Sequence, residues 1–251
     1  DALNILVYEL SRSRSEYTRL LAHSEQLTTY SSPKHKGLIL GHLTELYRQF
    51  NRLDEALALQ KRMSEDETLP SEMRLYMSYG LHMSQMQRTG DVESCETFII
   101  DTLADLPPRT AARAFFINGL ARIRMDQNQK YESIRLCREA IEHGRGQASK
   151  AFIEGLEGNI GHSLAGLGHL DEAYAILGEK LEQMRSSRHV RFDKVTTCWT
   201  LGQIDLARGQ FSKAYSHFQQ GLATALNVGD VRFVRVMAAL KASTLYLMGE
   251  A

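Results

Sequence analysis

Apolar residues follow a long repeat along most of the chain. A large apolar residue, at which a helix would begin, recurs at spacings of 39, 39, 39 and 41 residues, at Leu53, Val92, Tyr131, Leu170 and Phe211. Three residues later a small residue recurs at Ala56, Cys95, Ala173 and Ala214, with Ile134 as the exception. Two residues before the large apolar residue stands a turn-forming residue, at Asn51, Gly90, Gly168 and Gly209, with Gln129 as the exception.

This pattern predicts hairpins of two helices. Gly or Asn supplies the left-handed residue that ends the first helix, and the small residue lets the two helices approach closely. Pro33, Pro70 and Pro107 lie 37 residues apart and separate consecutive hairpins, because proline lacks the N–H that a helix interior needs. We expect hairpins at 2–30, 35–66, 71–104, 109–143, 148–186 and 190–228, then a last helix from Val231 to Met248.

Composition agrees with an all-α chain. Only four prolines occur in 251 residues, and Leu and Ala outnumber Val, which favours helix over sheet. The 30 Lys and Arg residues balance the 30 Asp and Glu residues, so bulk charge does not attract nucleic acid or an acidic membrane. No apolar run reaches the length of about 20 residues that a membrane span needs. We expect a single repeat domain, 1–251, without direct nucleic-acid or membrane binding.

The repeats resemble the tetratricopeptide repeat. Residues Leu201, Gly202, Gly209, Phe211, Ala214 and Phe218 match that family's pattern best; Gly161 to Leu177 follows it nearly as well, and Leu43 to Ala56 follows with Thr44 in the glycine position. The resemblance implies a right-handed superhelix of about six stacked hairpins. The repeats of this sequence are 39–41 residues long, whereas the plain tetratricopeptide repeat has 34 residues. Longer repeats of this kind resemble the helical sensor regions of bacterial regulators, namely those of the MalT type, the Rap type and repeat-bearing diguanylate cyclases.

The resemblance also implies a binding surface. In this family the first helices of the hairpins line a concave groove. The matching positions here are Glu45, Arg48, Arg122, Asn159, His162, Trp199 and Gln203. Trp199 is the only tryptophan, and it has two interpretations: a binding anchor in the groove, or a half-buried packing residue.

The sequence contains few candidates for catalysis or cofactor binding. It contains no H-E-x-x-H motif, nucleophile elbow or phosphate-binding loop, so we expect no enzyme activity, metal or cofactor. Gly155, Gly158 and Gly161 lie three apart on one expected helix, where close packing explains them better than a nucleotide loop. The basic run Arg185–Arg191 is interpreted as a solvated linker.

Three cysteines, Cys95, Cys137 and Cys198, form no C-x-x-C pair and fit neither a disulfide framework nor a zinc cluster. They favour a reducing cytoplasm, and Cys95 and Cys198 fall at small or apolar repeat positions of the core.

Together these observations predict a non-catalytic sensor or protein-interaction domain of a bacterial signalling or transcription regulator. Its groove would bind a peptide, a partner protein or a small effector. An alternative is an oligomerisation scaffold that acts through the exposed terminal helix and forms a homodimer. Because Gly249 resembles the turns at Gly168 and Gly209, we expect the chain to be a fragment of a longer regulator, cut within its last repeat. The alternative is that the unpaired last helix caps the stack of hairpins.

Overall fold

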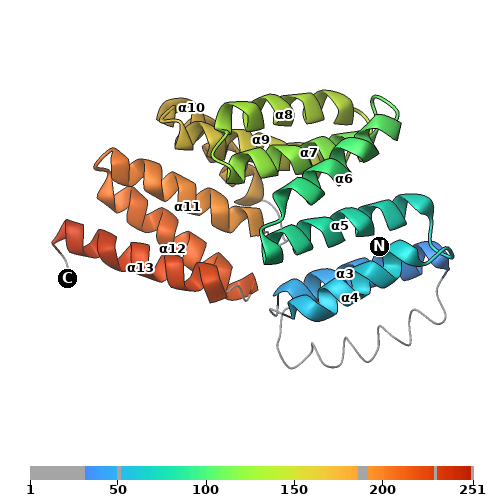
Figure 1. Ribbon diagram of the computed structural model, residues 1–251. Helices are drawn as coiled ribbons and strands as arrows, with labels where there is room; N and C mark the ends of the chain where they lie inside the picture. The colour runs from blue at the N-terminus through green and yellow to red at the C-terminus, as the bar shows by residue number, and fades with distance from the viewer. Residues whose placement is uncertain (1–31, 50–51, 186–191, 229–230, 250–251) are drawn as a thin grey trace. The chain divides into compact units, whose positions relative to one another are not determined.

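The computed structural model describes residues 32–49, 52–185, 192–228 and 231–249 (Figure 1). These residues form eleven α-helices and no strand, which confirms the all-α fold. The predicted leading hairpin at 2–30 and the basic run after Arg185 lie outside the described residues. The chain divides into two compact units, residues 1–102 and 103–251, and the division falls near the end of one helix, α6.

The first unit contains α3 (Pro33–Gln49), α4 (Leu53–Glu65), α5 (Ser71–Thr89) and most of α6 (Val92–Asp105). Helix α4 packs against both α3 and α5. The contact between α5 and α6 includes the stacked rings of His82 and Phe98, whose centroids lie 3.9 Å apart, and Cys95 Sγ 3.6 Å from Met83 Sδ.

The second unit continues the same arrangement through seven helices, each packed on the next (Figure 1). They are α7 (Ala111–Asp126), α8 (Lys130–Gly144), α9 (Lys150–Gly166), α10 (Leu170–Arg185), α11 (Phe192–Ala207), α12 (Phe211–Val228) and α13 (Val231–Met248). The pairs from α3·α4 to α11·α12 coincide with the five predicted hairpins at 35–228, and α13 coincides with the predicted last helix.

The turns within the hairpins have the predicted backbone. Gly90, Gly168 and Gly209 have φ of 76°, 85° and 68°, a left-handed conformation that costs glycine little. The small residues that follow are almost fully buried, with exposed fractions of 0–1%, at Ala56, Cys95, Ala173 and Ala214. The small side chain therefore lies where the helices of the hairpin meet.

In the third hairpin, the predicted positions of the turn residue and of the start of the second helix are wrong by one residue. The left-handed residue is Asn128, with φ of 62°, and not Gln129, so the second helix begins at Lys130 rather than at Tyr131. Tyr131 is 70% exposed. The small buried residue three positions after Lys130 is Ser133, at 1% exposed, and the predicted exception at Ile134 disappears. Asparagine tolerates left-handed backbone better than other non-glycine residues, which explains why the turn forms there.

The glycine row on α9 reflects packing at two of its three positions. A Cβ on Gly161 would lie 2.8 Å from Leu177 Cγ, and a Cβ on Gly158 would overlap the Lys180 ammonium, whereas Gly155 faces open space. Leu177 is fully buried. Close helix packing, the predicted explanation, therefore holds for Gly158 and Gly161 and not for Gly155.

These glycines give a matched pair of substitutions. Gly161→Ala is expected to destabilise the protein by about 1–3 kcal/mol, because the added methyl overpacks against the buried Leu177. Gly155→Ala is expected to stabilise it by about 0.5–1 kcal/mol, because alanine loses less backbone entropy in a helix and nothing obstructs its methyl. Urea unfolding followed by circular dichroism measures both, and equal effects would contradict the packing described for α9.

Candidate functional site

Side-chain hydrogen bonds join the first helices of three successive hairpins in the second unit. Asn159 Nδ2 on α9 donates to Asn118 Oδ1 on α7, at 3.1 Å. One turn further along α9, His162 Nδ1 lies 2.8 Å from the Thr200 hydroxyl on α11. We call these four residues, Asn118, Asn159, His162 and Thr200, the first-helix strip. Asn118, Asn159 and His162 are each half-buried.

A partly buried ion pair lies near His162. Lys180 on α10 is only 6% exposed; its Nζ approaches α9 at Gly158 and lies 3.4 Å from Asp193 Oδ2 on α11. The missing side chain at Gly158 provides the space for this lysine. His162 therefore lies within reach of a positive charge that is paired with a carboxylate.

Burial, together with the charge of Lys180, lowers the pKa of His162 from 6.5 to about 4. The ring is therefore neutral near pH 7 and offers one donor and one acceptor nitrogen. In the unfolded chain the imidazole takes up a proton near pH 6.5, so the folded state loses stability as the pH falls from 6.5 towards 4.

Trp199 is half-buried on α11. Its ring meets Phe233 of α13 edge to face, with centroids 6.3 Å apart, and it packs at the margin of the core cluster of Ala214, Phe218 and Met237. This contact agrees with the packing interpretation of Trp199. The partly exposed ring next to Thr200 also keeps the anchor interpretation open.

The other predicted groove residues make fewer described contacts. Arg122 on α7 and Gln203 on α11 are exposed. Gln203 lies one turn after Trp199 on the same helix. Glu45 and Arg48 belong to α3 in the first unit, and their side chains lie outside the described set. The structure thus connects Asn159 and His162 to neighbouring helices, and the role of all seven residues in binding stays a prediction.

Sequence reasoning missed several residues of this site. Asn118 stands 41 residues before Asn159, so the repeat frame contained the signal. Lys180 comes from a second helix, α10, whereas Asp193 and Phe233 lie on α11 and α13 at positions that were not assigned to the groove. The contacts of these three residues depend on how neighbouring hairpins pack.

A second polar cluster joins α10, α11 and α12. Asp205 is fully buried; His217 Nδ1 lies 2.8 Å from its Oδ2, and the rings of Tyr174 and His217 meet edge to face with centroids 6.5 Å apart. Arg208 lies 4.8 Å above the Tyr174 ring and pairs with Asp171. Burial, together with the Asp205 charge, raises the pKa of Tyr174, so its hydroxyl keeps its proton at neutral pH.

The thiols lie in the core. Cys95, Cys137 and Cys198 are free and buried, as predicted for Cys95 and Cys198. Burial raises the pKa of Cys95 to about 11 and that of Cys137 to about 12, so both stay protonated and are poor nucleophiles or metal ligands at neutral pH. Among the described residues, no group of three or more His, Cys, Asp or Glu side chains is placed to hold a metal ion.

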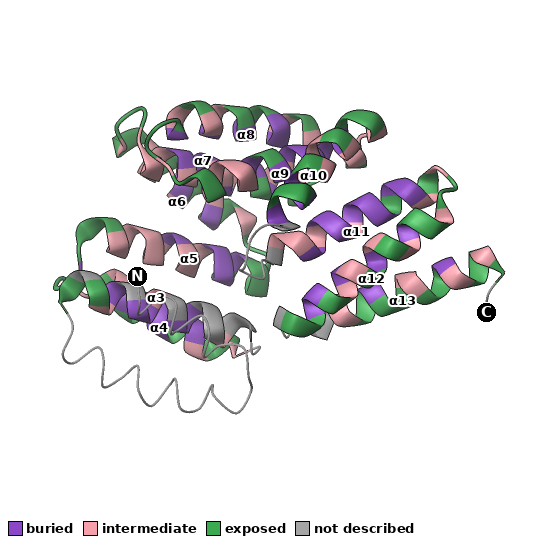
Figure 2. Ribbon diagram, turned by 180° about the vertical axis from the view of Figure 1, so that it is seen from behind, coloured by how far each residue is buried: buried purple, intermediate pink, exposed green. Residues whose placement is uncertain are grey.

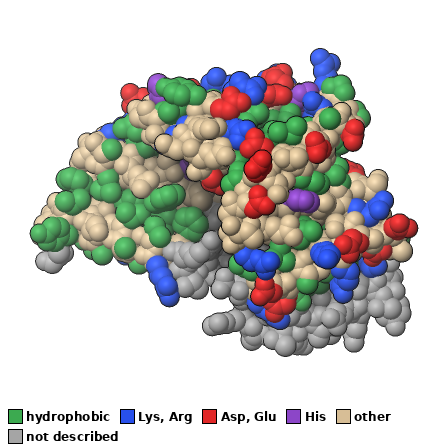
Figure 3. Space-filling model, viewed as in Figure 1, with side chains coloured by type: hydrophobic (Ala, Val, Ile, Leu, Met, Phe, Trp, Pro, Cys, Tyr) green, Lys and Arg blue, Asp and Glu red, His purple; other side chains and the backbone are tan. Residues whose placement is uncertain are grey.

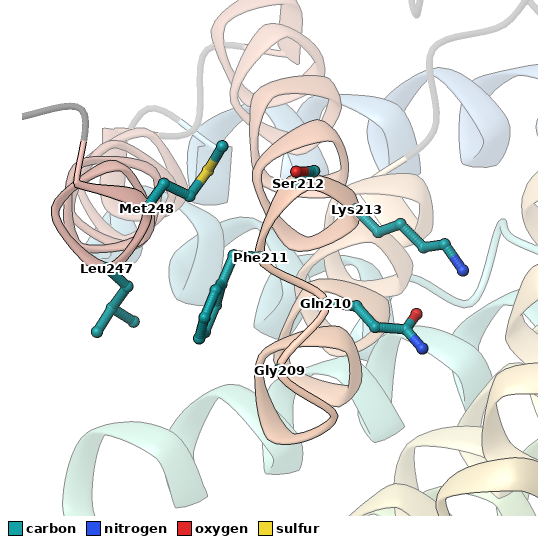
Figure 4. Close-up of a pocket in the computed structure, with 7 residues that line it drawn as sticks. All are labelled: Gly209, Gln210, Phe211, Ser212, Lys213, Leu247 and Met248. Atoms are coloured by element: carbon teal, nitrogen blue, oxygen red, sulfur yellow. The ribbon is translucent and has the colours of Figure 1, made fainter.

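A shallow depression lies between the start of α12 and the end of α13 (Figure 4). Phe211 and Met248 line it from the two helices, while Gln210 and Lys213 extend to the far side of α12 in this view. The ammonium of Lys213 and the amide of Gln210 therefore lie away from the apolar side chains of Phe211, Leu247 and Met248. The described helices include none that is both long and apolar enough to cross a membrane.

By sequence, the chain matches no protein-family model and no curated protein. Several solved structures share its fold. The chain has a tetratricopeptide-repeat-like fold. A signal-transduction ATPase with numerous domains and a tetratricopeptide repeat sensor, from Pyrococcus horikoshii, matches with a TM-score of 0.62 and 12% identity, over 97% of this chain and 37% of that one.

Two further structures show the same likeness. The Cut9–Hcn1 hetero-tetramer of APC/C matches with a TM-score of 0.55 and 15% identity, over 95% of this chain and 48% of that one. BtubC (BKLC) from P. vanneervenii matches with a TM-score of 0.53 and 18% identity, over 89% of this chain and 91% of that one. At these identities the comparisons establish the fold and leave the binding residues to be argued from the site.

Proposed function

We propose that this chain is a non-catalytic protein-interaction domain that binds a peptide segment of a partner along the first helices of its second unit. The first-helix strip is the observation that carries the proposal. It places amide and imidazole groups from adjacent hairpins in one row, next to the partly exposed Trp199. A peptide backbone presents N–H and C=O groups at regular intervals, which such a row pairs with.

The remaining chemistry favours binding over catalysis. The neutral His162 and the two asparagines provide donors and acceptors without a nucleophile or an activated base. The positive charge of Lys180 is paired with Asp193, so it supports the strip as a fixed neighbour. Exposed Arg122 and Gln203 extend the polar surface on α7 and α11.

The larger role that we propose is sensing within a signalling or transcription regulator of a bacterium, in the cytoplasm. The structure from Pyrococcus horikoshii supports a sensing role, since its repeats are named as a sensor, and the Cut9–Hcn1 assembly supports a protein partner. The alternative ligand for the first-helix strip is a small effector molecule instead of a peptide.

Peptide selection tests this function. Twelve-residue peptides selected on the immobilised chain are expected to lose about tenfold in affinity for Asn159→Ala and for Trp199→Ala, because each change removes a hydrogen-bonding group or an apolar anchor. Glu179→Ala, at an exposed position on the second helix α10, is the matched control and is expected to leave affinity unchanged.

Thermal unfolding of each variant separates binding from folding. Trp199→Ala is expected to keep its helical circular dichroism while it loses affinity. If affinity and helicity fall together, Trp199 is a core residue. If the selected peptides bind all variants equally, the strip is not the binding site and the proposal fails.

A further inference from the structure

Gly155 is a glycine inside α9 that the packing of the described helices does not require. The glycines that follow it, Gly158 and Gly161, leave room for side chains of α10. A Cβ on Gly155 would meet no atom within 4 Å, and its backbone lacks the positive φ at which glycine is favoured. Because glycine inside a helix destabilises the fold relative to alanine, its presence here requires a reason other than packing.

Gly155 lies on the surface of α9 between the contacts that this helix makes with α7 and with α11. An α-helix turns by about 100° per residue, so Asn159 lies about 40° and Phe152 about 60° to one side of Gly155. Both of these residues contact α7. His162, which contacts α11, lies about 20° to the other side. The open position therefore belongs to the same surface of α9 as the first-helix strip, one turn before Asn159.

The neighbouring first helices carry side chains at the matching position. Counted back from the left-handed turn residue of each hairpin, the position of Gly155 is occupied by Phe115 on α7 and by Thr196 on α11. Most of α7 and α11 is buried or half-buried, whereas α8 has an exposed outer row (Figure 2). Of these three first helices, α9 alone lets another molecule approach its backbone at this position.

Two phenylalanine rings lie one turn from the open position. Phe152 on α9 stacks on Phe115 of α7, with centroids 6.3 Å apart, and both residues are half-buried. Lys, Arg, Asp and Glu side chains are intermixed over the region of α7 and α8 in the space-filling view, so no charge of a single sign dominates there (Figure 3). The rings therefore favour an apolar occupant over a charged one.

We propose that Gly155 is a specificity-determining position of the first-helix strip. The bound peptide passes close to the backbone of α9 at Gly155 and places one large apolar side chain, a Leu, Met or Phe, against the rings of Phe115 and Phe152. The amides of Asn118 and Asn159, one turn along α9, then lie beside the adjoining peptide backbone. This inference rests on the proposed function and names the class of residue that the strip selects.

Gly178 provides the matched control for a test by mutation. It also lies inside a helix, α10, with no atom of the described structure within 4 Å of an added Cβ, but on a second helix. Gly155→Gln is expected to weaken the binding of twelve-residue peptides selected on the immobilised chain by about tenfold, because the added side chain occupies the place of the apolar residue. Gly178→Gln is expected to bind these peptides as the unmodified chain does.

Alanine at the same two positions separates binding from stability. Gly155→Ala and Gly178→Ala are both expected to raise the urea midpoint of unfolding, because alanine stabilises a helix and neither methyl group meets a neighbour. Only Gly155→Ala is expected to weaken peptide binding as well, by about threefold. A gain in stability with unchanged affinity for both variants would show that Gly155 has no role in binding and would overturn the proposal.

The selected peptides supply a second test. They are expected to share one large apolar residue. Its replacement by Ala is expected to weaken binding about tenfold on the unmodified chain and less than about twofold on Gly155→Gln, because the two changes remove the same contact. Equal losses on both chains would place that residue elsewhere and overturn the proposal, as would selected peptides without a shared large apolar residue.

Asn159→Ala distinguishes this inference from the function on which it rests. If Asn159→Ala loses affinity while Gly155→Gln does not, the strip binds peptide and only the role of Gly155 is wrong. If both variants bind as the unmodified chain does, the proposed function fails as well. Circular dichroism of the glycine variants, expected to match that of the unmodified chain, verifies that they fold.

Discussion

Phe218→Ala is expected to lower the free energy of unfolding by about 3–5 kcal/mol, among the largest effects of any single substitution in this chain. Phe218 is fully buried and packs with Val195, Ala214 and Met237. Its ring lies against Gly202 of α11, so its removal leaves a cavity between the helices of one hairpin. The neighbouring backbone cannot close a space of this size without shifting a helix, which is why the cost exceeds the loss of apolar contact alone.

Urea unfolding followed by far-ultraviolet circular dichroism measures this effect. Leu226→Ala is the matched control, because Leu226 lies on the same helix and is 60% exposed; it is expected to change stability by at most about 0.5 kcal/mol. A loss below about 1 kcal/mol for Phe218→Ala would contradict the core described here.

His217→Ala is expected to destabilise the chain by about 3–5 kcal/mol, because it leaves the Asp205 carboxylate buried without its nearest partner. Asp205 is fully buried, and an ionised carboxylate only accepts hydrogen bonds, so the His217 Nδ1–H donates to it. The other carboxylate oxygen, Asp205 Oδ1, is buried and has no hydrogen-bond partner among the described residues, so His217 is the donor on which the carboxylate depends.

The preceding hairpin supplies the control for this pair. There, Leu164 and Ile176 occupy the positions of Asp205 and His217, and Leu164 is 5% exposed. The double variant Asp205→Leu/His217→Ile copies that apolar pair and is expected to recover most of the lost stability, because a packed apolar pair replaces a buried charge. His169→Ala, at an exposed position, is expected to be neutral. If His217→Ala were as mild as His169→Ala, the buried pair would not contribute to stability.

Much of the fold could be predicted because its signals are local. Gly168 and Gly209 end helices through their own backbone freedom, and Ala173 and Ala214 mark helix contacts three residues after each second helix begins. The third hairpin shows the limit of such signals. Asn128 and Gln129 are both polar, and only the observed backbone shows which of them adopts the left-handed conformation.

The candidate site was predictable only in part. The repeat frame placed Asn159, His162 and Trp199 on first helices, and they lie there. The repeat spacing gave no information on which side chains of other helices contact these three residues. Thr200 beside His162 and Phe233 beside Trp199 come from the following repeats, and their distances depend on how neighbouring hairpins pack.

The sequence by itself determined the helices, the hairpin turns and the small residues at helix contacts, because backbone preference and apolar spacing act within about 40 residues of chain. Only the tertiary structure decided that Lys180 fills the space over Gly158 and that Asp205 pairs with His217. Each of these contacts places a charged group between two helices, so its free energy depends on how far the helices bury that charge. The degree of burial is set by the packing of the whole chain and cannot be read from any one repeat.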